Sequence, residues 1–289
     1  IKDGGQINVS TLGQGDGGSL IVTAKNIFID GGSYTEKGVG MYADTYGSGN
    51  AGDIYITTNT LEMRGLAQIS TSTRAQGRGG SLRINADQVI LSGAEGNVST
   101  GLYSQAESSG SGGDIQVTAG NLQIYDGALI SSGTKGSGEA GNISLTAPWI
   151  TMANGGGIWA RTLGSGTGGN IQLSGSQIQL FDGASISAES KGTGNAGNIG
   201  INAGGTLLMK NSSITTETTQ ADGGNIHIKA GHMVELIDSK ITTSVGGGPQ
   251  TTGGNITIDP QFVILNDSQI IANAYEGKGG NIRIVADVF

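Results

Sequence analysis

A short glycine-rich segment recurs along the whole chain, and this repetition limits the fold more than any other feature. The pattern Gly-Gly-Asn-Ile-x-Ile, or a close relative of it, occurs ten times in 289 residues, at intervals close to 28. Such self-similarity is typical of repeat proteins, in which each repeat packs only against its neighbours. We therefore expect one elongated array. The second glycine of each copy is Gly18, Gly52, Gly80, Gly113, Gly141, Gly169, Gly197, Gly224, Gly254 or Gly280.

The repeat formed by residues 170–197 shows the strand pattern most clearly. Apolar and polar residues alternate in three stretches, which begin at Ile171, Ile178 and Ile186. A period of two is typical of half-buried strands, and no window carries the 3.6-residue period of a helix. Three strands per repeat predict one triangular coil of a right-handed parallel β-helix. The predicted fold class is therefore an all-β solenoid with about ten coils of about 28 residues.

Glycine and aspartate mark the turns between these strands. Gly175 allows the first corner, and Asp182-Gly183 supplies the second, because both residue types tolerate a positive φ. Residues 192–197 are expected to form the third corner as a longer loop. The second corner recurs at Asp30-Gly31 and Asp126-Gly127.

Stacking brings the same repeat position together from coil to coil. Coils about 4.8 Å apart would place the asparagine after the repeated glycines in one column, where side-chain amides hydrogen-bond as a ladder. We predict a structural role for this ladder, formed by Asn142, Asn170, Asn198, Asn225, Asn255 and Asn281. A buried aliphatic column is predicted at Met41, Ile69, Leu102, Ile130, Ile158, Ile186, Ile214, Ile241 and Ile270.

Residues 1–289 are expected to form a single β-solenoid domain. The residues around Asp3 match those around Asp182, so the chain starts at the third strand of a repeat, and a second strand begins near Asp287. Solenoids need polar caps for solubility, and neither end shows one. We therefore expect a piece of a longer rod or fibre, or identical units that close each other's ends.

The composition limits the partners. Fifteen Lys and Arg against 23 Asp and Glu give a net charge of -8, which disfavours nucleic acid and anionic lipid. No apolar run approaches the roughly 18 residues of a membrane span, so no membrane insertion is expected. The chain has no cysteine, which leaves neither a disulfide framework nor a thiolate site. No metal or other cofactor is expected.

The repeats resemble those of a known bacterial family. The succession Gly-Gly-Asn-Ile-x-Ile-x-Ala, Leu-x-Leu-x-x-Gly-Ala-x-Ile and Gly-x-Gly-x-Ala-Gly is most complete in residues 170–224. It is similar to the repeats of filamentous-haemagglutinin-type exoproteins, the passengers of two-partner secretion, and the resemblance covers essentially the whole chain. The resemblance implies a β-helical rod secreted to the bacterial cell surface or extracellular matrix. It does not choose among adhesins, surface fibres and toxin-delivery stalks, because all use one kind of rod.

Residues that suggest chemistry have simpler explanations here. Segments such as residues 192–197 match G-x-G-x-x-G, but a dinucleotide site needs that turn to open a helix, and each of these leads into a strand. His227 and His232 lie on one repeat without a nucleophile and form no triad. We therefore expect no enzyme. A polysaccharide-cleaving β-helix is the minor alternative, which carboxylates within about 10 Å on one strand face would favour.

One outward column is rich in large aromatic side chains. The residue after the third-strand aliphatic position is aromatic at Tyr42, Tyr103 and Trp159, on alternate coils about 9.6 Å apart. Exposed rings in a row can stack on sugar rings, so these three are candidate ligand-binding residues. The alternative is that the rings pack under insertions at residues 33–40 and 92–101, or against a neighbouring rod.

These features predict a rigid, non-catalytic rod, either a secreted adhesin or a segment of an extracellular filament. The expected partners are other copies of the chain, joined end to end or laterally, or the surface of a host or neighbouring cell. A glycan-binding module that uses the aromatic column is the alternative, with polysaccharide as its partner.

Overall fold

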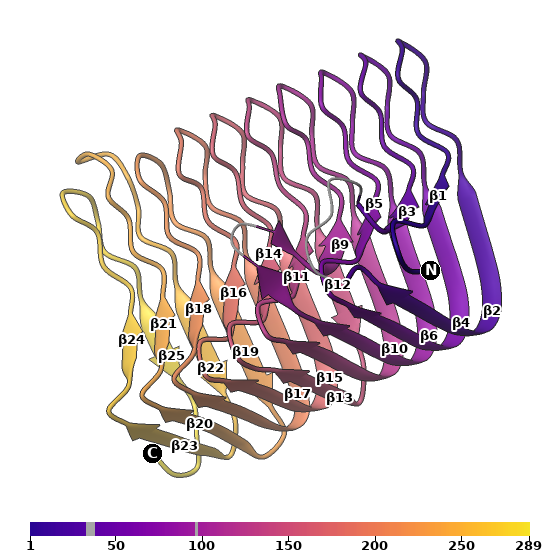
Figure 1. The fold of residues 1–289 in the computed structure, drawn as a ribbon. Helices are drawn as coiled ribbons and strands as arrows, with labels where there is room; N and C mark the ends of the chain where they lie inside the picture. Colours follow the sequence, from indigo (N-terminus) through magenta and orange to yellow (C-terminus); the bar gives the residue numbers. More distant parts are fainter. Residues whose placement is uncertain (33–37, 96–97) are drawn as a thin grey trace.

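The predicted β-solenoid is confirmed in a computed structural model that describes residues 1–32, 38–95 and 98–289. Every regular element in these ranges is a strand, and the strands wind into coils stacked along one axis, with the two termini at opposite ends of the stack (Figure 1). Each strand of the two large sheets pairs in parallel with the equivalent strand of a neighbouring coil, as Ile171 does with Ile199. A period-two pattern repeated every 28 residues allows this arrangement, because each coil buries its apolar positions against its neighbours.

The larger sheet, sheet A, has thirteen strands. In most coils the first two predicted strands join into one long strand. At Gly175, where a corner was predicted, the strand continues with only a register shift against the next coil. The strand divides at Pro148 and Pro260, where proline has no N–H to donate to the ladder, and also at Gly231-His232, where no proline is present. Sheet A contains β2 (Leu20–Asp30), β4 (Ile54–Arg64), β6 (Leu82–Ser92), β10 (Ile115–Tyr125), β12 (Ile143–Thr146), β13 (Trp149–Met152), β15 (Ile171–Phe181), β17 (Ile199–Lys210), β19 (Ile226–Ala230), β20 (Met233–Ile237), β22 (Ile256–Asp259), β23 (Phe262–Asn266) and β25 (Ile282–Ile284).

The smaller sheet, sheet B, has ten strands of three residues, one from each coil. A separate antiparallel pair, β7 (Ala94–Glu95) and β8 (Val98–Ser99), lies in the connection before β9. Sheet B contains β1 (Gln6–Asn8), β3 (Gly40–Tyr42), β5 (Gln68–Ser70), β9 (Gly101–Tyr103), β11 (Leu129–Ser131), β14 (Gly157–Trp159), β16 (Ser185–Ser187), β18 (Ser213–Thr215), β21 (Lys240–Thr242) and β24 (Gln269–Ile271).

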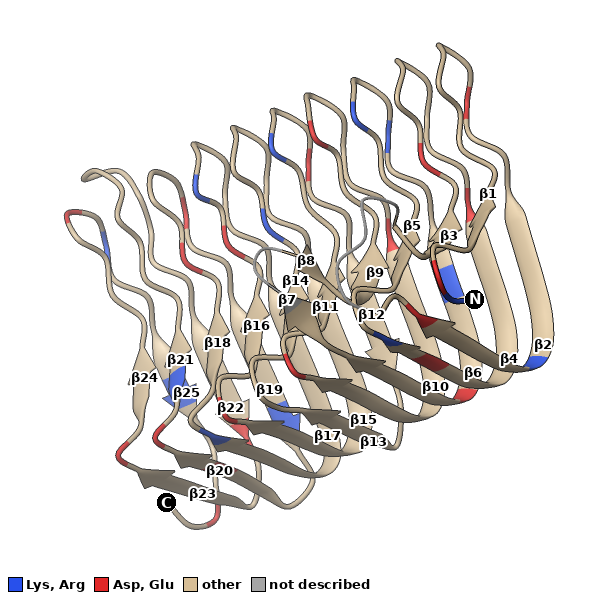
Figure 2. Ribbon diagram, viewed as in Figure 1, with Lys and Arg blue, Asp and Glu red and all other residues tan. Residues whose placement is uncertain are grey.

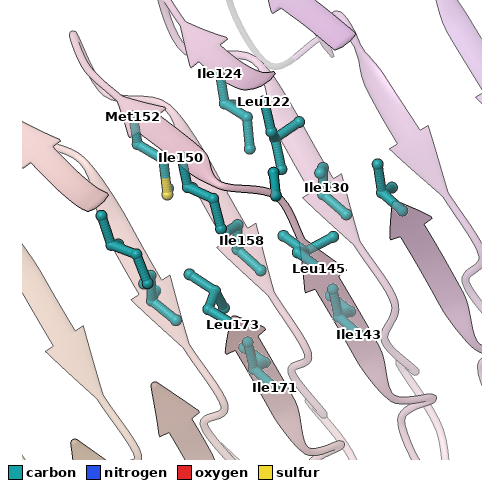
Figure 3. Packing of buried hydrophobic residues seen from close by; sticks show 14 of the residues in the cluster. Leu122, Ile124, Ile130, Ile143, Leu145, Ile150, Met152, Ile158, Ile171 and Leu173 are labelled. Atoms are coloured by element: carbon teal, nitrogen blue, oxygen red, sulfur yellow. The ribbon is translucent and has the colours of Figure 1, made fainter. Parts of the chain in front are cut away.

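The core is a continuous column of aliphatic side chains between the sheets. Figure 3 shows Leu145, Ile150 and Ile158, from three strands of one coil, pointing into the interior, and all three are fully buried. The predicted aliphatic column is buried from Met41 to Ile241, whereas Ile270 is partly buried against the core. No coil has a core of its own, so the stability of each depends on its neighbours.

The loops after sheet B project from the coils and stack on one another, so the longer loop predicted at residues 192–197 is present, although it extends outward instead of turning a tight corner. We call the stacked loops the fin, which rises above sheet B in Figure 1. The base of most of these loops is closed by the repeated glycine, as when Gly197 N–H donates to Ala188 O at 2.9 Å. The fin comprises residues 12–16, 46–50, 74–78, 107–111, 135–139, 163–167, 191–195, 219–222, 246–251 and 275–278.

Close stacking explains why the fin requires glycine. A Cβ built on Gly192, Gly194 or Gly197 would overlap the backbone carbonyl of Gly164, Gly166 or Gly169 in the preceding coil. The G-x-G-x-x-G pattern therefore leaves room for one loop to lie directly on the next.

The aspartate corners follow the prediction at two of the three sites. Asp126 and Asp182 have positive φ values of 53° and 49°, each followed by a glycine that also has positive φ. At Asp30 the prediction is wrong, because the positive φ there, 62°, belongs to Gly32. Asp30 instead accepts hydrogen bonds from Gly32 N–H and Arg64, which lower the pKa of this exposed carboxyl.

Candidate ligand-binding face

A hollowed surface with polar and aromatic lining residues lies along sheet B. We call it the sheet-B face: the outward side chains of sheet B together with those that lead to the fin. Three hollows of about 560, 210 and 590 Å³ follow one another along it. The first lies over β3, β5 and β9, the second beside Trp159, and the third between Glu189 and Tyr275.

The predicted aromatic column has the expected register but does not present three open rings. Tyr42, Tyr103 and Trp159 occupy one column, separated by Ser70 and Ser131. Tyr42 is only 9% exposed, and Tyr103 is half-buried with its Oη donating to Ser99 O at 2.9 Å. For the two tyrosines the structure agrees with the alternative that the rings pack under the insertions, because chain from the longer repeats covers them.

The covering segments belong to the insertions that the sequence shows. Gly38 contacts the Tyr42 hydroxyl so closely that a Cβ on this glycine would overlap it, and Ser99 belongs to β8. Residues 33–37 and 96–97 of the two insertions lie outside the described residues. Burial raises the pKa of Tyr42 to about 12 and also raises the pKa of Tyr103.

Trp159 is held by polar groups of its own coil and the next one. Its Nε1 donates to Ser185 Oγ at 3.0 Å, and the Arg161 guanidinium lies 4.1 Å from the ring centroid. Arg161 also donates to Ser187 Oγ at 2.7 Å and lies 3.5 Å from a Glu189 carboxylate oxygen. Burial lowers the pKa of Arg161 and Glu189 opposes that shift. The indole is therefore fixed between a cation and the sheet.

A buried carboxylate lies at the bottom of the first hollow. Asp44 is 7% exposed, and its Oδ1 accepts hydrogen bonds from Ser70 Oγ at 2.6 Å and from Ser72 N–H at 2.8 Å. Burial raises the pKa of Asp44, and these two hydrogen bonds oppose the shift. The sequence analysis did not identify Asp44. Nothing in the repeat marks Asp44 as special, because the same column carries Glu189 and Glu217 in later coils.

Side chains of opposite charge form pairs on the sheet-B face. Lys135 lies 3.5 Å from Glu107, and Arg161 pairs with Glu189 in the column two residues nearer sheet B. Figure 2 shows acidic and basic positions interspersed along the stack, and the described residues form no continuous basic stripe.

Carboxylates do approach each other on one strand face. Glu189 and Glu217 precede the paired residues Ser190 and Thr218 of adjacent coils, so their backbones are about 4.8 Å apart. This spacing meets the criterion set for the polysaccharide-cleaving alternative. Glu189, however, is engaged by Arg161, and a glycosidase also requires one carboxyl that is protonated as the general acid.

Both histidines are exposed. His232 Nδ1 lies 3.3 Å from Gln261 Oε1 with its ring edge-on to Phe262. Among the described residues, no three histidine, aspartate or glutamate side chains gather as metal ligands.

The six asparagines of the predicted ladder stack one per coil, between each fin loop and the sheet A strand that follows it. Each Nδ2 donates to the Oδ1 of the preceding member, and the same Oδ1 also accepts the backbone N–H of the following asparagine. The first member, Asn142, donates to Asp114, which can only accept. The remaining Nδ2 to Oδ1 distances are 3.1 Å for Asn225 to Asn198, 3.1 Å for Asn255 to Asn225 and 2.9 Å for Asn281 to Asn255.

Comparison with known proteins gives no relative from which a function could be assigned. No family model, curated protein or solved structure matched this chain. In the described ranges, no helix has the length and apolar character needed to cross a membrane.

Proposed function

We propose that the chain is a rigid, non-catalytic segment of an extracellular rod, as in a secreted adhesin or a surface filament. The observation that carries the proposal is the unbroken stack. Sheet B pairs from β1 to β24 without a gap, and the strands of sheet A pair from β2 to β25. A hinge would need a coil boundary where such pairing stops, and none occurs among the described residues.

Three axial ladders stiffen this stack. Backbone hydrogen bonds link every coil of both sheets, the asparagine amides link the coils from Asp114 to Asn281, and the fin loops pack glycine on glycine. To bend the rod, these contacts would have to open between the same two coils. The arrangement therefore suits a spacer that holds a partner at a fixed distance or builds a coat.

The proposed location is the bacterial cell surface or extracellular matrix, reached by two-partner secretion. Its support is the resemblance of the repeats and the absence of cysteine, which makes the fold independent of the redox compartment. The proposed partners are other copies of the chain or the surface of a host or neighbouring cell.

Imaging tests this proposal. Antibodies raised against residues 1–289 should label the surface or surrounding matrix of the producing cells in immunogold electron microscopy, and the labelled material should consist of straight rods. Label confined to the cell interior, or globular labelled particles, would overturn the proposal.

The structure does not present a row of three open aromatic rings for glycan binding. Tyr42 is covered, Tyr103 is held by β8, and Trp159 is stacked on Arg161. The two tyrosines instead line the first hollow of the sheet-B face.

A further inference from the structure

A hollow of about 570 Å³ lies on the outer surface of sheet A, beside the asparagine ladder. It lies where one outward position lacks a side chain, because Gly200 pairs in register with Gln172 on one side and His227 on the other. At the next outward position Asn202 pairs with Lys229. Every lining residue lies between positions 170 and 229, within the described part of the chain.

The ladder asparagines at the edge of this hollow have a spare donor but no spare acceptor. Asn198 Oδ1 accepts both Asn225 N–H at 2.9 Å and Asn225 Nδ2 at 3.1 Å, which uses its two lone pairs. Asn198 Nδ2 carries two N–H groups and donates one of them, to Asn170 Oδ1 at 3.0 Å. Asn225 is engaged in the same way by Asn255. The ladder therefore offers a ligand one N–H per coil, about 4.8 Å apart.

Two basic side chains add to these donors. His227 and Lys229 are exposed and line the hollow, and neither forms an ion pair within the described ranges. The lining contains no carboxylate, although the chain has 23 Asp and Glu. Asp259 of β22 pairs in register with Lys229 but lies outside the lining. The hollow is thus a local concentration of donors, which favours an anionic ligand group.

The other polar side chains of the lining narrow the class of anion. Gln172 and Asn202 are exposed, and each carries a side-chain carbonyl beside its amide N–H groups. These carbonyls accept hydrogen bonds from sugar hydroxyls, whereas the phosphodiester backbone of DNA has no hydroxyl to donate. A carboxylate accepts charge-assisted hydrogen bonds from a lysine and from amides. A uronate sugar carries a carboxylate and hydroxyls on one ring, so it matches both kinds of group.

We propose that this hollow binds a uronate unit of an acidic polysaccharide. Lys229 and the ladder amides donate to the carboxylate, and Gln172 and Asn202 bind sugar hydroxyls. The polysaccharide runs along the ladder, which repeats the same donor on neighbouring coils. This site goes beyond the proposed structural role, and the rod does not depend on it.

Calorimetric titration of the full 289-residue chain tests the site with three soluble probes. Hexa-galacturonate carries both carboxylates and hydroxyls, cellohexaose carries hydroxyls without charge, and a thymidine hexanucleotide carries negative charge without hydroxyls along its backbone. We expect hexa-galacturonate to bind and each of the other two probes to bind at least tenfold more weakly.

Lys229→Gln tests the charge of the site. The glutamine keeps a donor but removes the cation, so affinity for hexa-galacturonate should fall tenfold or more. The matched control Lys210→Gln removes the same charge from the end of β17, outside the hollow, and should leave affinity within twofold.

Gly200→Gln tests the shape of the site without changing its charge. The new side chain is the one that Gln172 already places at this position one coil earlier, and it would fill the hollow. A Cβ on Gly200 would overlap only atoms of the Gln172 side chain, which is exposed and can move aside. We therefore expect Gly200→Gln to fold and to bind hexa-galacturonate at least tenfold more weakly than the parent.

Any of four results would overturn the site. Hexa-galacturonate does not bind, cellohexaose or the hexanucleotide binds as tightly, Lys229→Gln and Lys210→Gln weaken binding equally, or Gly200→Gln binds like the parent. Circular dichroism checks the fold of each variant, and if Lys229→Gln misfolds, Gly200→Gln decides the question. None of these results bears on the rod proposal, because imaging of the parent and of Gly200→Gln should show the same rods.

Discussion

The asparagine ladder can be tested by comparing an interior member with an end member. Asn198→Ala removes three hydrogen bonds: Nδ2 to Asn170 Oδ1 at 3.0 Å, and the bonds that Asn198 Oδ1 accepts from Asn225 N–H at 2.9 Å and from Asn225 Nδ2 at 3.1 Å. Asn281→Ala removes only one, from Nδ2 to Asn255 Oδ1 at 2.9 Å. Both side chains are exposed, so each bond contributes near the low end of the usual range, about 0.5 kcal/mol. We expect losses of about 1.5 and 0.5 kcal/mol.

The assay must report local stability, because a solenoid does not unfold in two states. Native-state hydrogen exchange of β17 and β19 gives the opening free energy of the coils beside Asn198, and exchange of β22 and β25 gives that beside Asn281. Far-UV circular dichroism controls for the fold. Equal losses for the two variants, within about 0.3 kcal/mol, would refute the cooperative ladder and leave the asparagines as solvated turn residues.

Three further predictions follow from burial, stacking and charge. Ile186→Asp should cost more than about 3 kcal/mol, because the site is fully buried and offers the carboxylate no partner. A loss below about 1 kcal/mol in native-state hydrogen exchange of β16 and its neighbours would contradict the inward register. Gly192→Ala should cost about 2 kcal/mol, because its Cβ would overlap the Gly164 carbonyl. The control Gly13→Ala lies at the same repeat position with no atom within 4 Å of its Cβ, so it should be nearly neutral. Equal melting temperatures of the two variants would mean that the fin loops are not stacked. Burial raises the pKa of the Asp44 carboxyl above its ordinary 3.8, so the fold loses stability as pH rises and this carboxyl ionises. Asp44→Asn should therefore be more stable than the parent at pH 7 and no more stable at pH 3. A stability difference that does not change with pH would show that ionisation of Asp44 is not the cause.

The architecture could be predicted because its causes are local and repeated. The alternation around Ile171, Ile178 and Ile186 gives the inward positions, and their recurrence every 28 residues gives the stacking. The column of asparagines followed directly from that register. One coil was enough to define the rest, because each coil repeats the same contacts.

The fin and the covering of the two tyrosines could not be predicted because they depend on how loops pack in space. The glycines of residues 192–197 are compatible with a tight corner or with a projecting loop, and only contact with the loop of residues 164–169 distinguishes the two. Likewise, Tyr42 and Tyr103 have an outward register, which gave an exposed aromatic row, but register does not tell whether an insertion folds back over a side chain. Asp44 went unnoticed because it belongs to no repeated motif.

The central claim is that the coils form one continuous, stiff stack, and amide hydrogen exchange resolved along the chain tests it most directly. Asn170, Asn198, Asn225 and Asn255 are exposed, yet each of their backbone N–H groups donates to the asparagine of the preceding coil. The account predicts that these amides exchange as slowly as those of the neighbouring sheet A strands, with uniform protection from β4 to β22. Fast exchange at the four asparagines, or a coil boundary where protection falls by a factor of a hundred or more (about 2.7 kcal/mol), would show a segmented chain and contradict the rod.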